Sequence, residues 1–324
     1  MSVTGETRLF RESEVSIDGI GGSLIIPDGG DGTTALIISG SGPSDRDGNH
    51  PTRGANNIYR MLAQSLAQNG IASLRYDKRG VGASKNLVVS EADLTIADFA
   101  SDVTLLANWL AAQPFANRVV LIGHSEGSML ALMAQPRKDL AAIVSLTGAG
   151  RPLHDVLRFQ LLERPAITPE LAADLTRVLD ALRGDTALDP IPAPYAHLFR
   201  ESVRPFLRSV VNIDPAALLA TRPEPVLIVG GAQDIQVTRK DFDLLVGARA
   251  TQSTPLWIDD MTHILKPVLA SDATTFDVYR DPHRPLSQAF IDGLIGWLMM
   301  LAASCPQSTS RASVQTRAAA RWCT

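Results

Sequence analysis

The chain has 324 residues, of which 45% are apolar, so it can form one large domain or two modest ones around a sizeable core. Thirty basic side chains against 34 acidic ones give a net charge of −4. This balance argues against a nucleic-acid-binding protein and against a polybasic membrane anchor. Both cysteines, Cys305 and Cys323, lie near the C-terminus, which excludes a disulfide framework for the body of the protein.

The N-terminus and the apolar segments favour a soluble, cytoplasmic protein. The first residues lack the basic segment followed by an apolar one that a secretory signal requires. The most apolar stretch, residues 291–303, contains Asp292 and is shorter than the roughly 20 residues that a membrane-spanning helix needs. We therefore expect no membrane association.

The first 150 residues alternate short apolar runs with amphipathic stretches. Helices are expected where apolar residues recur at helical spacing, over residues 58–66, 96–110 and 125–134. Strands are expected at residues 15–17, 23–26, 35–38, 71–76, 119–122 and 142–146. This alternation predicts βαβ units, and hence an α/β fold with a mainly parallel sheet that is covered by helices on both faces.

The alternation stops after residue 150. Residues 151–221 show helical patterns without a buried strand, whereas strands return at 226–229 and 254–258, before a last helix over 286–301. We therefore expect one core, built from residues 1–150 and 222–301, with residues 151–221 as a helical cap over one edge of the sheet. A merely peripheral helical hairpin is the alternative. The tail, residues 302–324, has no apolar period and is expected to be disordered.

A nucleophile motif follows the strand at 119–122. The segment Gly123-His124-Ser125-Glu126-Gly127 is G-x-S-x-G between a buried strand and a helix. In this context a sharp turn exposes the serine hydroxyl, and the following helix directs its N-terminus at a developing oxyanion. Ser125 is therefore predicted as a nucleophile; the alternative is a tight turn whose serine only caps the helix.

Two further segments accompany this motif. Residues 40–49 read G-S-G-P-S-D-R-D-G-N, and residues 75–84 contain D-x-R-G-x-G-x-S. With these three motifs the sequence resembles the α/β-hydrolase superfamily, and within it a bacterial esterase-like group that carries G-H-S-E-G and G-S-G-P-x-D-R-D-G-N. The resemblance spans about residues 15–300. It implies the α/β-hydrolase fold, with a mainly parallel central sheet flanked by helices and a helical cap insertion.

The resemblance also implies a base and an acid, because a serine hydroxyl needs an oriented base to become nucleophilic. In the family's order of serine, acid and histidine, the base falls at His263 and the acid at Asp234. His283 is the rival base, and a surface turn is the alternative role for His263. The other nearby acids fit less well: Asp241 and Asp243 would lie inside a helix, while Asp259 and Asp260 are very near the histidine in sequence.

The family's oxyanion hole consists of backbone amides. Here it would pair the amide of Glu126 with that of Ser41, with Gly42 as neighbour. Ser39 stands where many relatives have histidine, which changes the outer support of the hole. A dinucleotide-binding role for Gly40-x-Gly42 fails, since no third glycine follows at the required spacing.

Several charged residues near this loop have open roles. For Asp45, Arg46 and Asp47 we favour a salt-bridge network that holds the oxyanion loop over a metal site, and Asp77 and Arg79 are further candidates for that network. The side chain of Glu126 would face the mouth of the pocket or be solvated beside the helix N-terminus.

The resulting hypothesis is a serine hydrolase, by resemblance a carboxylesterase acting on small or medium acyl esters. No cofactor and no metal are needed for such chemistry. A thioesterase and an aminopeptidase-like hydrolase use the same triad, and a non-catalytic ligand-binding homologue is the alternative from another class. Acyl chain length, alcohol and oligomeric state do not follow from the sequence.

Overall fold

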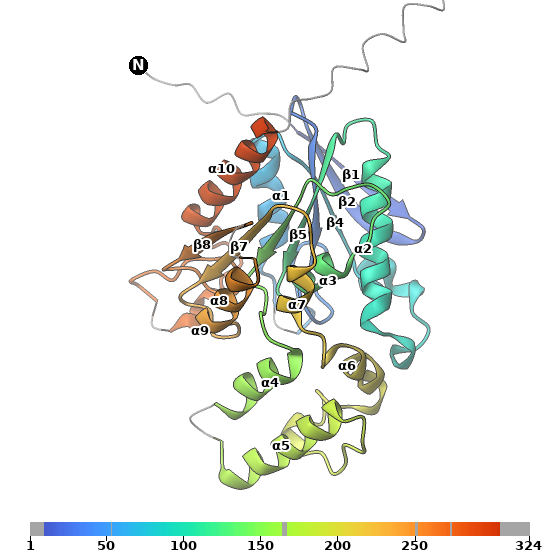
Figure 1. Cartoon of the computed structure of the whole chain (residues 1–324), viewed down its shortest axis with the longest axis vertical. Helices are drawn as coiled ribbons and strands as arrows, with labels where there is room; N and C mark the ends of the chain where they lie inside the picture. Colours follow the sequence, from blue (N-terminus) through green and yellow to red (C-terminus); the bar gives the residue numbers. More distant parts are fainter. Residues whose placement is uncertain (1–9, 53, 164–166, 250–251, 273, 305–324) are drawn as a thin grey trace, which may run out of the picture.

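The computed structural model describes residues 10–52, 54–163, 167–249, 252–272 and 274–304. Figure 1 shows a central sheet with helices on both faces and a further group of helices beyond one end of it. The strands are β1 (Phe10–Ile17), β2 (Ile20–Pro27), β3 (Thr33–Ile38), β4 (Ala72–Tyr76), β5 (Arg118–His124), β6 (Ala142–Leu146), β7 (Val226–Gly231) and β8 (Ser253–Ile258). The α-helices are α1 (Ile58–Gln68), α2 (Ile96–Ala111), α3 (Glu126–Met133), α4 (Leu153–Leu162), α5 (Pro169–Arg183), α6 (Arg204–Val210), α7 (Pro215–Ala220), α8 (Arg239–Ala248), α9 (Thr275–Arg280) and α10 (Gln288–Ser304). The 3₁₀-helices are η1 (Gly82–Leu87), η2 (Glu91–Asp93), η3 (Ala193–Tyr195) and η4 (Glu201–Val203).

Within the described residues the strands form one sheet of eight in the order β1-β2-β4-β3-β5-β6-β7-β8. β2 runs antiparallel to β1 and to β4, whereas every other neighbouring pair is parallel. The predicted mainly parallel α/β sheet is therefore confirmed. The carboxyl ends of β3 to β7 meet at one edge, where ligands bind in open α/β sheets.

The first two strands are longer than predicted. They form a hairpin whose turn residues Asp18 and Gly19 both have positive φ, 48° and 85°, as a tight hairpin turn requires. β1 lies at the edge of the sheet, so polar side chains such as Glu12 and Glu14 stay exposed. An edge strand needs no continuous apolar run, and its first half therefore gave no apolar signal in the sequence.

Two apolar layers cover the sheet. Leu36 and Ile38 of β3 point into a cluster with residues of α2 and α3, while Ala35 and Ile37 point into a second cluster with residues of α1 and α10. All six residues of β3 are buried, as expected for a strand that is covered on both faces. These layers fix the central strands, and with them the loops at their carboxyl ends.

The helices of residues 153–220 lie between β6 and β7 and have an apolar cluster of their own. Figure 1 shows α4, α5 and α6 beyond the sheet, at the end opposite the N-terminus. Leu175, Val178, Leu182 and Phe199 are fully or almost fully buried in this cluster. Since α4 follows the carboxyl end of β6, the helices begin at the edge where β5 ends. Whether they act as a cap stays a prediction.

The C-terminal boundary differs slightly from the predicted one. α10 continues to Ser304, so the predicted tail begins inside this helix. Residues 305–324, which we expect to be disordered, lie outside the described residues.

Candidate active site

The predicted nucleophile lies on a strained turn between β5 and α3. Ser125 has φ 54° and ψ −119°, a conformation that non-glycine residues adopt rarely and at a cost. A Cβ at Gly123 would lie 2.2 Å from the carbonyl oxygen of Gly127, and one at Gly127 would lie 2.3 Å from that of Ile38. Only glycine fits at either position. Backbone atoms therefore pack tightly around both glycines of the elbow.

The predicted base and acid are in direct contact. Nδ1 of His263 lies 2.8 Å from Oδ2 of Asp234, and their side chains are only 6% and 1% exposed. The other carboxylate oxygen accepts hydrogen bonds from the amides of Gln236 and Val237. These amides hold the carboxylate so that it accepts a hydrogen bond from Nδ1–H of His263. In this tautomer Nε2 carries no proton and can accept one. The rival His283 is exposed, and its backbone amide donates to Asp281 in a turn.

His263 lies against the residue that precedes the nucleophile. The rings of His124 and His263 are 5.0 Å apart between centroids, and Nε2 of His124 is 2.7 Å from the carbonyl oxygen of His263. The hydroxyl of Thr147 donates to the same carbonyl at 3.4 Å. The structure thus brings the predicted acid and base together, and sets the base beside the elbow that carries Ser125.

A buried hydrogen-bond chain continues from His124 to the oxyanion loop. Because the carbonyl of His263 only accepts, Nε2 of His124 is the donor and Nδ1 the acceptor. The hydroxyl of Tyr59 therefore donates to Nδ1 at 2.9 Å, and accepts from the amide of Gly40 at 2.8 Å. Complete burial lowers the pKa of His124 to about 3, so its ring is neutral and keeps this tautomer. Burial likewise raises the pKa of Tyr59, which keeps its proton.

Both predicted oxyanion donors adjoin the nucleophile. Glu126 is the first residue of α3, so its amide belongs to the unpaired N–H groups of a helix N-terminus. Gly40 precedes Ser41, and a Cβ on Gly40 would lie 3.2 Å from the Cβ of Ser125. Within the described part of the chain, the amide of Ser41 donates to no protein acceptor. The Ser41 amide can therefore donate a hydrogen bond to an oxyanion that forms near the nucleophile.

The side chain of Glu126 is not solvated. It is 12% exposed, and Oε1 lies 3.5 Å from Nζ of Lys78, which is 4% exposed. Nζ also donates to the carbonyl oxygen of Gly40 at 2.6 Å. No local pattern in the sequence indicates a role for Lys78, Tyr59 or the side chain of His124. Their roles depend on contacts between segments that are far apart in the chain.

The charged loop after Gly42 forms an ion-pair network, with two differences from the prediction. Arg46 pairs with Asp77 at 2.8 Å, and Arg75 pairs with Asp47 at 2.7 Å. The carboxylate of Asp45 instead accepts from backbone amides of its own turn. Arg79 does not join, because its side chain pairs with Asp102 and Asp98 of α2. Among the described residues, no group of three or more His, Cys, Asp or Glu side chains is placed to hold a metal ion.

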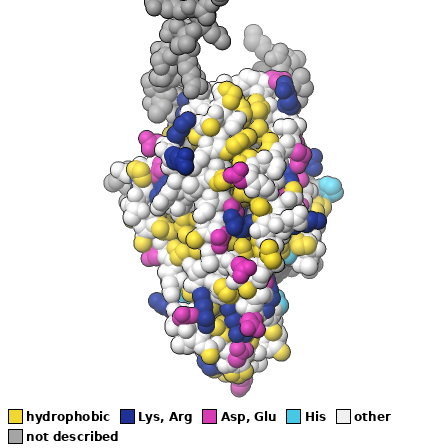
Figure 2. Space-filling model, turned by 90° about the vertical axis from the view of Figure 1, so that its right-hand side faces the viewer, with side chains coloured by type: hydrophobic (Ala, Val, Ile, Leu, Met, Phe, Trp, Pro, Cys, Tyr) yellow, Lys and Arg dark blue, Asp and Glu magenta, His cyan; other side chains and the backbone are white. Residues whose placement is uncertain are grey.

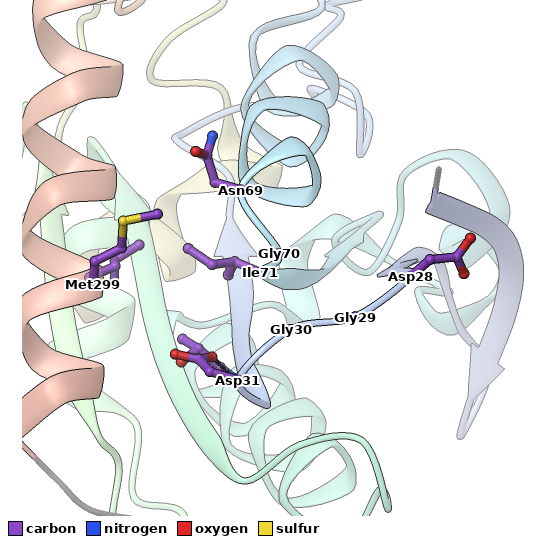
Figure 3. A pocket seen from close by; sticks show the side chains of 10 residues that line it. Asp28, Gly29, Gly30, Asp31, Asn69, Gly70, Ile71 and Met299 are labelled. Atoms are coloured by element: carbon purple, nitrogen blue, oxygen red, sulfur yellow. Dashed lines mark hydrogen bonds between the residues drawn. The ribbon is translucent and has the colours of Figure 1, made fainter. Parts of the chain in front are cut away.

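A separate cavity lies away from this site. Figure 3 shows it between the turn that contains Asp28 and Asp31, the end of α1, and Met299 of α10. It adjoins the amino ends of β3 and β4, whereas Ser125 follows the carboxyl end of β5. Asp31 is already paired with Arg118. This cavity therefore plays no part in the site described above.

Comparison with known proteins places the fold in a family. The profile of the Alpha/beta hydrolase family matches residues 38–278. The chain belongs to this family. The loops that carry Ser125, Asp234 and His263 all lie inside the matched range.

The chain is also similar to individual proteins that are named as esterases. Esterase EstD of Thermotoga maritima is 28% identical over 268 residues, which is 79% of this chain and 60% of EstD. The probable aminopeptidase YbaC of Bacillus subtilis is 38% identical over 68 residues, 21% of each chain. The chain thus spans about 60% of the length of EstD and about a fifth of that of YbaC. The solved structure of the Pyrococcus furiosus esterase Pf2001 has a TM-score of 0.53 at 16% identity, covering 91% of this chain and 93% of that one. At this identity the likeness shows the fold alone.

Charged side chains of both signs are spread over the surface. Figure 2 shows basic and acidic side chains interspersed over one face of the molecule, including the helices at its lower end. None of the described helices combines the length and the apolar character needed to cross a membrane.

Proposed function

We propose that the protein is a serine carboxylesterase that cleaves small or medium acyl esters. The observation that carries the proposal is the buried pair of His263 and Asp234, 2.8 Å apart, which lies against His124, the residue before the strained Ser125. A strained residue and a buried carboxylate–imidazole pair cost stability, and such features cluster at catalytic sites. The family and the esterase name of EstD support the same chemistry.

The proposed reaction is acyl transfer in two halves. Oγ of Ser125 attacks the ester carbonyl while Nε2 of His263 takes its proton, and the amides of Ser41 and Glu126 hold the oxygen that becomes negative. His263 then returns the proton to the departing alkoxide, which leaves as alcohol. Water repeats the sequence on the acyl-enzyme: His263 takes a proton from water, and Ser125 recovers it as the carboxylic acid leaves. Asp234 stabilises the imidazolium in both halves.

Thioester and aminoacyl amide hydrolysis are the closest alternatives, because the same groups act on any activated acyl compound. The similarity to the probable aminopeptidase YbaC favours amide hydrolysis, but the match covers a fifth of each chain. Rates on p-nitrophenyl acyl esters, acyl-CoA and aminoacyl anilides decide among these activities. Preference for the anilides by an order of magnitude in kcat/KM would replace the esterase proposal.

Fluorophosphonate labelling tests the serine chemistry directly. We expect the wild-type protein to be labelled and to hydrolyse p-nitrophenyl butyrate, and Ser125→Ala to lose the label and about 10⁴-fold or more in kcat. Ser101→Ala is the matched control, since Ser101 is an exposed serine of α2 that bonds to its own helix. A folded wild-type protein without label, or label retained in Ser125→Ala, would leave a non-catalytic binding protein as the better description.

A further inference from the structure

A buried lysine lies behind the oxyanion loop, where the reaction itself assigns it no role. Lys78 follows β4, and its side chain is 4% exposed. Its ammonium donates to the carbonyl oxygen of Gly40 at 2.6 Å, lies 3.5 Å from the carboxylate of Glu126, and lies 5.6 Å from the centre of the Phe99 ring. A lysine is rarely buried to this extent, and such burial requires a partner of opposite charge. Glu126 is that partner, which leaves the contact with Gly40 to be explained.

The carbonyl that Lys78 holds belongs to the same peptide group as the Ser41 amide. A trans peptide is planar, so its C=O and N–H point in opposite directions. An ammonium fixed on the oxygen of Gly40 therefore directs the N–H of Ser41 away from the buried lysine. The positive charge also draws electron density toward the carbonyl oxygen, which makes the N–H a stronger hydrogen-bond donor.

Gly40 is held on its other side as well. Its own N–H donates to the hydroxyl of Tyr59, at 2.8 Å. Its Cα lies so close to the elbow that an added Cβ would be 3.2 Å from both Cβ of Ser125 and Nδ1 of His124. The Gly40–Ser41 peptide is thus fixed at both ends of Gly40 and adjoins the nucleophile.

We propose that Lys78 is a positioning residue of the oxyanion hole, which orients and polarises the Gly40–Ser41 peptide so that the Ser41 amide stabilises the oxyanion. The inference rests on the proposed acyl-transfer function. Lys78 acts through this peptide and touches no substrate. Its contribution grows as negative charge develops on the substrate oxygen, so it lowers the energy of the transition state more than that of the bound ester.

The test replaces the ammonium and separates binding from chemistry. In Lys78→Met we expect kcat on p-nitrophenyl butyrate to fall by about 10- to 100-fold with KM changed less than about threefold, since loss of a whole oxyanion donor costs about 10²- to 10³-fold. Inhibition by butylboronic acid, whose tetrahedral adduct resembles the transition state, should weaken by the same factor as kcat/KM. Lys78→Arg keeps a charged donor and should recover part of kcat.

The chain offers a matched control. Lys138 is exposed and also donates through Nζ to a backbone carbonyl, that of Ala111 at the end of α2. Lys138→Met should leave kcat, KM and boronate inhibition unchanged. If Lys78→Met folds poorly because Glu126 is left as an unpaired buried carboxylate, the double variant Lys78→Met/Glu126→Gln removes that charge. The same loss of kcat is expected in the folded double variant.

The outcomes separate the two proposals. An active, labelled wild-type enzyme whose folded Lys78 variants match Lys138→Met in kcat would overturn the role of Lys78 alone. A rise in KM with unchanged kcat and unchanged boronate inhibition would also overturn it, because that pattern means lost ground-state binding. A wild-type protein without hydrolysis or label would overturn both the esterase proposal and this inference.

Discussion

The two sides of the candidate site are positioned in different ways. On the nucleophile side, the turn of Ser125 is held by close backbone contacts, of Gly123 with Gly127 and of Gly127 with Ile38 at the end of β3. On the other side, the loops that carry His263 and Ser41 are joined by side chains, through His124 and Tyr59. The linked residues are 65 and 139 positions apart in the chain.

This difference indicates how each side responds to change. Backbone packing allows no intermediate arrangement, because a side chain at either elbow glycine would overlap a carbonyl group. A hydrogen-bond chain can lose one member and keep the fold, at the cost of unpaired buried groups and looser placement. Substitutions of the elbow glycines should therefore lower the stability of the fold first. Substitutions in the hydrogen-bond chain should lower the catalytic rate first.

The largest effect is expected at the elbow. Gly123→Ala places a methyl group 2.2 Å from the carbonyl oxygen of Gly127, so either the strand or the helix must move. We expect the free energy of unfolding to fall by about 3 kcal/mol or more, or the protein not to accumulate in soluble form. Urea denaturation followed by circular dichroism measures the change.

A helical glycine with open surroundings serves as the control. Gly247 lies in α8, and a Cβ there would meet no atom within 4 Å. Gly247→Ala should raise stability by about 0.5–1 kcal/mol, since alanine is the better helix former. If Gly123→Ala were as stable as Gly247→Ala, backbone packing would not be what holds the elbow.

A smaller effect on stability and a clearer one on rate are expected at Tyr59. Tyr59→Phe removes the hydroxyl between the amide of Gly40 and Nδ1 of His124, and leaves both without that partner. The cost is about 1–3 kcal/mol of stability. The hydroxyl of Tyr59 connects the oxyanion loop to His124, and through it to the base His263. Without this connection the two are placed less exactly, so kcat should fall about tenfold, with KM little changed.

Steady-state kinetics on a p-nitrophenyl ester, with Tyr195→Phe as the reference, measures this effect. Tyr195 packs against the separate apolar cluster of residues 153–220. The same substitution there removes a hydroxyl that takes no part in the hydrogen bonds between Gly40 and His263. A Tyr59→Phe enzyme with wild-type kcat would mean that the two loops are placed independently of this hydrogen-bond chain.

The same difference explains how much could be predicted from the sequence. The elbow, the parallel strands and the helices were predictable because their signals are local: a five-residue motif, buried apolar runs and helical spacing. The positions of Asp234 and His263 came from the resemblance to a family, since no local pattern distinguishes a loop histidine that meets an aspartate 29 residues away. Lys78, Tyr59 and the tautomer of His124 could not be predicted, because each depends on which loops meet at the edge of the sheet.

The mildest way to probe the hydrogen-bond chain is to change pH. The pKa of His124 is lowered to about 3 by burial, against an ordinary value of 6.5 when the chain is unfolded. Between these values the unfolded state binds one more proton at this residue than the folded state does. The stabilising effect of keeping His124 neutral is therefore complete above about pH 6.5 and is lost as the pH falls toward 3.

From this single group the free energy of unfolding should decrease by about 1.4 kcal/mol for each unit of pH below the upper value. His124→Gln keeps a donor toward the carbonyl of His263 and an acceptor for Tyr59 but does not titrate. Urea unfolding at intervals between pH 6 and 4 should therefore show a shallower dependence in His124→Gln than in the wild type, by about one proton. Equal slopes would mean that His124 is protonated in the folded protein, and Nδ1 would then donate to the hydroxyl of Tyr59 instead of accepting from it.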